Sequence, residues 1–70
     1  MRDRAMMVLE AYAEEVRIEK AAVAELGAEY AKAAGDDAKQ RDLTIKIVER
    51  KGRLAAWEQA FRALDQALEE

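Results

Sequence analysis

The sequence predicts an all-α protein, an antiparallel two-helix hairpin with a coiled-coil-like contact between its helices. Charged residues make up 39% and hydrophobic residues 51% of the 70 residues, a balance typical of long amphipathic helices. Apolar residues recur at alternating steps of four and three in both halves of the chain, which is the spacing of a helical seam. Proline and asparagine are absent, so that few positions favour a turn.

The first helix is expected over about residues 3–33. Its seam repeats with the 3.5-residue average period of a left-handed coiled coil and not with the two-residue period of a strand. Gly27 lies inside this helix and lowers its stability by about 1 kcal/mol relative to alanine. The predicted seam residues are Leu9, Tyr12, Val16, Glu19, Val23, Leu26 and Tyr30.

The turn is expected at residues 34–36. Gly35 can adopt the left-handed backbone conformation that ends a helix. Asp37 is the predicted N-cap of the second helix, with Gln40 three residues later completing a capping box, and Asp36 is the alternative cap. An acidic residue at this point also favours the positive end of the helix dipole.

The second helix is expected over about residues 37–69, and its seam matches that of the first. When the chain folds back at Gly35, every pair of facing seam residues has numbers that sum to 69 or 70. This match predicts a single helical-hairpin domain over residues 1–70. The predicted seam residues of the second helix are Leu43, Ile47, Arg50, Leu54, Trp57, Phe61, Leu64 and Leu68.

One pair of facing seam residues is charged. Glu19 and Arg50 lie at the middle of the predicted hairpin and face each other in this register. A shift by one heptad would place each charge against an apolar side chain. Because buried polar pairs are best known for fixing helix register, we interpret Glu19 and Arg50 as a register-setting salt bridge.

Several apolar and small residues fall outside the seam, where an isolated hairpin leaves them in water. A contiguous exposed apolar patch usually marks a contact, and burying three large side chains contributes about 4–8 kcal/mol before the costs of association. We expect this outer patch to bind a second copy, giving a homodimeric four-helix bundle, or a different protein. The outer patch consists of Ile18, Ala22, Ile45, Val48, Gly52 and Ala55.

Residue types that carry chemistry are scarce. Cysteine, serine and histidine are absent, which removes the usual nucleophiles, the neutral-pH general base and the common zinc ligands. We therefore predict no enzyme activity, no catalytic residue, no cofactor, no metal site and no small-molecule substrate. No apolar run approaches the roughly 18 residues of a membrane span, so that the expected location is the cytoplasm, with no membrane partner.

A basic face on the second helix gives an alternative. Lys46, Lys51 and Arg53 lie near its start. A four-helix bundle of two hairpins can bind RNA through such a face, as the plasmid-copy-number regulator Rop does, and the likeness is one of architecture. The net charge of −3 and the lack of aromatic residues between the basic positions argue against a nucleic-acid partner.

Two kinds of small protein resemble this chain. Its length and its corner, Gly35-Asp36-Asp37-Ala38-Lys39-Gln40, resemble those of the helical-hairpin co-chaperones of type III secretion needles, over six residues. Phage-encoded inhibitors, including anti-CRISPR proteins, are similar in being short, acidic, helical and free of catalytic residues. Both resemblances imply a non-enzymatic protein–protein interaction module, such as an adaptor, chaperone or inhibitor, which buries an apolar helix face against its partner.

Overall fold

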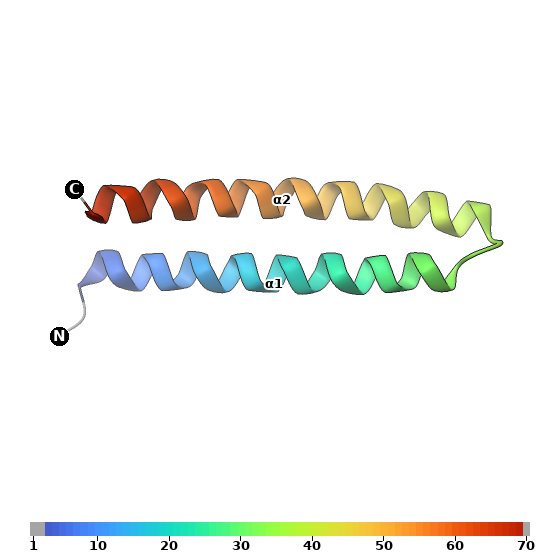
Figure 1. Ribbon diagram of the computed structural model, residues 1–70, viewed down its shortest axis with the longest axis horizontal. Coiled ribbons are helices and arrows are strands. Elements are labelled where there is room, and N and C mark those ends of the chain that lie inside the picture. Colours follow the sequence, from blue (N-terminus) through green and yellow to red (C-terminus); the bar gives the residue numbers. More distant parts are fainter. Residues whose placement is uncertain (1–2, 70) are drawn as a thin grey trace.

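The computed structural model describes residues 3–69 and contains two antiparallel helices that lie side by side (Figure 1). Helix α1 spans Arg4–Lys32 and helix α2 spans Asp37–Glu69. The start of α1 and the end of α2 lie at one end of the molecule, and the corner lies at the other. The hairpin measures 53 × 19 × 12 Å. The predicted helical hairpin is confirmed, and residues 3–69 contain no strand.

Capping hydrogen bonds define both ends of α1. The side chain of Asp3 accepts a hydrogen bond from the Ala5 amide at 3.3 Å, so that Asp3 is the N-cap and the helix begins one residue later than expected. At the other end the amide of Ala33 donates to the carbonyls of Glu29 and Tyr30, at 3.0 and 3.1 Å. Ala33 is buried against the corner and closes the helix.

The corner differs from the expectation in the residue that caps α2. Gly35 has a φ of +93°, the left-handed conformation that glycine adopts at little cost. The carboxylate of Asp36 accepts a hydrogen bond from the Lys39 amide at 3.1 Å, which makes Asp36 the N-cap. The prediction that Asp37 is the cap was therefore wrong, because Asp37 is already the first helical residue.

Gln40 also does not form the predicted capping box. Its side-chain amide donates to the backbone carbonyl of Tyr30 at 3.3 Å, across the corner from α2 to α1. The backbone amide of Gln40 donates to the carbonyl of Asp36 at 3.0 Å, as in a regular helix. Gln40 thus ties the two helices together at the corner.

The seam lies between the helices in the predicted register. The aromatic rings of Tyr12 and Trp57 meet edge to face with centroids 5.4 Å apart, as expected for positions that sum to 69. Seam residues from Leu9 to Leu64 are buried or half-buried, whereas Tyr30 and Leu68 at the seam ends are exposed.

The core is thin. Among residues 3–69 the buried hydrophobic residues are Ala33 and Leu43, and no large side chain is fully enclosed. This follows from the architecture, because each helix has a single neighbour and can bury only one stripe of its surface. Much of the apolar surface of both helices therefore stays accessible to a further protein.

Candidate protein interface

Glu19 and Arg50 lie together at the middle of the seam, where the sequence places them. One guanidinium nitrogen of Arg50, Nη1, lies 3.4 Å from Oε2 and 3.5 Å from Oε1 of Glu19. The Glu19 side chain is 8% exposed and that of Arg50 is 40% exposed. The carboxylate is therefore shielded from water while the guanidinium is not, and Arg50 supplies the opposite charge to a buried acid. Whether this pair sets the register stays a prediction.

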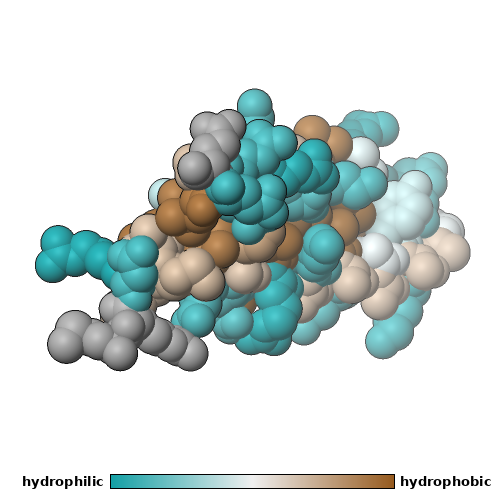
Figure 2. Space-filling view, turned by 60° about the vertical axis from the view of Figure 1, so that its left-hand side comes forward, coloured by the Kyte–Doolittle hydropathy of each residue, from teal (hydrophilic) through white to brown (hydrophobic). Residues whose placement is uncertain are grey.

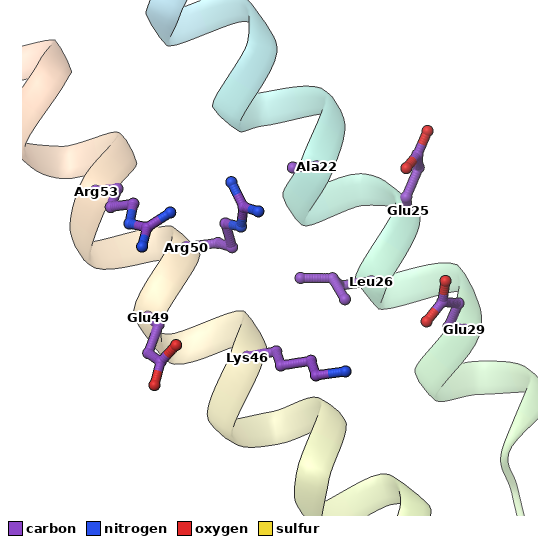
Figure 3. Close-up of a pocket in the computed structure, with 8 residues that line it drawn as sticks. All are labelled: Ala22, Glu25, Leu26, Glu29, Lys46, Glu49, Arg50 and Arg53. Atoms are coloured by element: carbon purple, nitrogen blue, oxygen red, sulfur yellow. The ribbon is translucent and has the colours of Figure 1, made fainter.

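The exposed side of Arg50 faces a cleft of about 390 Å³ between the helices (Figure 3). Lys46 and Arg50 extend from α2 into the space between the helices, and Leu26 of α1 lies near them. The full lining consists of Ala22, Glu25, Leu26, Glu29, Lys46, Glu49, Arg50 and Arg53. Three acidic and three basic residues line the cleft, so that it carries no net charge.

The three basic residues of the predicted nucleic-acid face do not lie together in one groove. Lys46 and Arg53 line this cleft beside the three glutamates, whereas Lys51 is exposed and does not line it. A groove that follows a phosphate backbone needs an excess of positive charge, which this cleft lacks. The geometry thus gives the RNA-binding alternative no support beyond that of the sequence.

The outer face of α2 carries two large apolar residues that are more than half exposed. Ile45 is 55% and Val48 is 64% exposed. Ile47 and Arg50 are seam residues that face α1. Each residue of a helix is rotated by about 100° from the one before it, so that Val48, one residue after Ile47 and two before Arg50, points away from α1. Gly52 and Ala55 continue at steps of four and three on the same face and are also exposed. We call Ile45, Val48, Gly52 and Ala55 the α2 stripe.

The other two residues of the predicted outer patch lie elsewhere. Ile18 is 44% exposed on α1 and precedes the seam residue Glu19, whereas Val48 follows the seam residue Ile47. Between antiparallel helices these opposite offsets of about 100° correspond to opposite faces of the hairpin. Ala22, one turn after Ile18, is half-buried at the polar cleft. A flat partner on the α2 stripe would therefore not reach Ile18 or Ala22.

The free end of the hairpin exposes further apolar side chains. Met6, Met7 and Val8 on α1 and Leu68 on α2 are exposed there. Figure 2, in which this end is turned forward, shows apolar side chains between hydrophilic ones along the hairpin. The sequence carried a signal for this exposure, since three consecutive apolar residues of a helix cannot all face one seam. We did not include these residues in the predicted interface.

A second cleft, of about 270 Å³, lies nearer the free end. Its apolar floor includes Val16 and Phe61, and its rim carries Lys20, Glu58 and Arg62. Arg62 and Glu58 form a salt bridge at 3.5 Å within α2. Because the floor residues are seam residues, this cleft is the open side of the thin core.

A hydrogen-bonded pair on the surface of α1 shifts two pKa values. Arg17 binds Glu14 through Nη2 and through Nε, the latter at 3.0 Å. These side-chain hydrogen bonds lower the pKa of Glu14 and raise the pKa of Arg17. Both side chains are well exposed, so that the pair belongs to the hydrated surface of the helix and adds little stability.

Thr44 and Tyr12 make contacts that belong to the helices and their seam. The hydroxyl of Thr44 donates to the carbonyl of Gln40 at 2.8 Å, and the ring of Tyr12 packs against Trp57. Within residues 3–69 no group of three or more acidic side chains is placed to hold a metal ion. Neither described helix is long and apolar enough to pass through a bilayer.

Comparison with known proteins adds no relative. No protein-family model matches the chain, and neither the curated proteins nor the solved structures show a significant match to it. The function must therefore be argued from the surface of the hairpin itself.

Proposed function

We propose that this protein is a non-enzymatic helical interaction module that buries an apolar helix face against a second copy or another protein. The observation that carries the proposal is the α2 stripe, where Ile45 and Val48 are more than half exposed on a face that α1 does not cover. Exposed apolar residues in a continuous row are typical of contact surfaces, whereas single ones are common on any protein. An adaptor, a chaperone and an inhibitor would all act in this way.

Self-association into a four-helix assembly is the form of this function that the thin core favours. Small domains of this length bury little surface and usually need a disulfide, a metal or association between chains. The chain contains no cysteine or histidine, so that association is the remaining route. Charged residues on both sides of the α2 stripe would then select the partner, as in the polar rim of an interface.

Two measurements test the proposal together. The first is sedimentation velocity of the wild-type protein and of Val48→Glu over a wide concentration range. The second is affinity capture from the native host with both proteins as baits, where only partners that the wild type binds and Val48→Glu loses are counted. Self-association or capture that depends on Val48 supports the proposal. A monomeric wild type that captures the same proteins as Val48→Glu refutes it.

A further inference from the structure

The α2 stripe is complementary to itself, and we infer that its partner is α2 of a second copy of this chain, packed in the antiparallel direction. This inference rests on the proposed function and names the partner. When residues whose numbers sum to 100 face each other, Val48 lies opposite Gly52 and Ile45 lies opposite Ala55. Each large side chain thus meets a small residue of the second copy, and the twofold axis repeats both contacts.

The space around Gly52 supports such a contact. A Cβ atom added at Gly52 would meet no side chain or backbone within 4 Å apart from its own helical turns and chain neighbours, so that packing inside the hairpin does not require glycine there. Glycine weakens a helix interior relative to alanine. The close approach of a second helix, with Val48 placed over Gly52, gives this glycine a role that the single hairpin does not.

The exposed area of the hairpin is large enough for a dimer interface. The accessible surface is 5531 Å². A compact protein of the same mass exposes about 4,400 Å² by the usual scaling, so that the hairpin exposes an excess of about 1,100 Å². A stable interface of standard size buries about 800 Å² from each partner. A standard-size contact with one copy of the same chain would therefore cover most of the excess.

The residues beyond the stripe suit the ends of a short interface. In the same register Arg41 lies opposite Gln59, so that a guanidinium donor faces an amide acceptor where the apolar stripe ends. An apolar centre with polar ends is the usual composition of an interface. In the resulting assembly α2 lies between α1 and the second α2, which gives a layer of four helices and not a square bundle.

The charges beside the stripe distinguish this arrangement from a parallel one. Lys51 and Glu49 lie at the same level of the two antiparallel helices but on opposite sides of the stripe. The twofold axis brings equal sides together, so that Lys51 approaches Lys51 of the second copy on one side and Glu49 approaches Glu49 on the other. A parallel pairing would instead bring Lys51 to Glu49 but would set Val48 against Val48 and Gly52 against Gly52. Exposed like charges at the rim have a small effect, whereas a mismatch of large and small residues leaves a gap.

The test exchanges the two side chains that face each other. Gly52→Val sets two valines against each other and should weaken self-association more than about tenfold in sedimentation equilibrium. The double variant Val48→Gly/Gly52→Val restores one large and one small residue and should return the Kd to within a few-fold of wild type. Gly27→Val is the matched control on α1, where a Cβ also has open space, and it should leave the Kd unchanged.

The direction of pairing is tested with Lys51→Gln. Antiparallel packing predicts tighter association, because the repulsion between the two lysines is removed, whereas parallel packing predicts weaker association. Weaker association of Lys51→Gln, or a Gly52→Val variant that associates as well as wild type, would overturn the inference. A wild type that is monomeric at millimolar concentration would also overturn it, while the capture comparison with Val48→Glu would still decide the proposed function.

Discussion

Replacing Arg50 by leucine is the most informative change in the seam, because it leaves the shielded carboxylate of Glu19 without its opposite charge. Removing one member of a buried ion pair costs about 3–5 kcal/mol. Since the Arg50 side chain is 40% exposed, water reaches the pair from that side. We therefore expect Arg50→Leu to lower the free energy of unfolding by about 2–3 kcal/mol, below the range for a dry site.

Replacing Glu19 by leucine should lower the free energy of unfolding less than Arg50→Leu does, and replacing both residues should lower it least. In Glu19→Leu the long side chain of Arg50 can turn towards the water that it already contacts, so that we expect a loss of about 1 kcal/mol or less. In Glu19→Leu/Arg50→Leu the two leucines form an ordinary apolar contact, and stability should return to that of the wild type or exceed it.

Urea unfolding measures these differences, with the fluorescence of Trp57, the single tryptophan, and far-UV circular dichroism as probes. Protein concentration is held constant because association would add to stability. Arg53→Leu, an exposed arginine three residues further along α2, is the control and should change stability by less than about 0.5 kcal/mol. These expectations follow from a shielded Glu19 beside a water-accessible Arg50. They would be refuted if the two single variants lost equal stability, or if the double variant lost the sum of the two single losses.

Three further predictions concern other contacts. Asp36→Ala should lower the free energy of unfolding by about 1 kcal/mol through loss of the N-cap, whereas Asp37→Ala should change it by a few tenths; comparable losses would contradict the capping assignment. Trp57→Ala should cost about 2–3 kcal/mol in thermal unfolding, less than for a fully buried tryptophan, because the ring is half-buried. NMR titration should find the pKa of Glu14 below its ordinary value and, in Arg17→Ala, back in the usual range; the small stability of this pair is present above the unfolded-state pKa and is lost as pH falls through the folded-state value.

The hairpin could be predicted from the sequence because its register depends on a pattern that repeats along both helices. Each pair of seam residues indicates the same register. Tyr12 and Trp57, whose numbers sum to 69, are in contact as that register predicts. The cap of α2 could not be predicted in this way, because Asp36 and Asp37 are neighbours with the same chemistry. Which of the two caps α2 depends on the residue at which the backbone enters the helix after the left-handed turn at Gly35, and this is visible only in the three-dimensional corner.

The candidate interface could be predicted only in part. Spacing along α2 identified Ile45 and Val48 as residues outside the seam, and both are exposed. Spacing within one helix does not show how the faces of two helices are arranged, so that Ile18 was grouped with residues on the opposite face. The different exposure of Glu19 and Arg50 also needs the structure, since seam positions are equivalent in sequence and the longer arginine side chain reaches water.

The corner at Gly35 has a consequence for the order in which the molecule forms. Facing seam residues are 17 positions apart at Leu26 and Leu43, next to the corner, and 52 positions apart at Leu9 and Phe61, near the free end. Closing a short loop loses less chain entropy than closing a long one. Seam contacts should therefore form first at the corner and then one after another towards the other end of the hairpin. The aromatic pair at Tyr12 and Trp57 would close late and open early, which makes Trp57 fluorescence a reporter of the last step of folding.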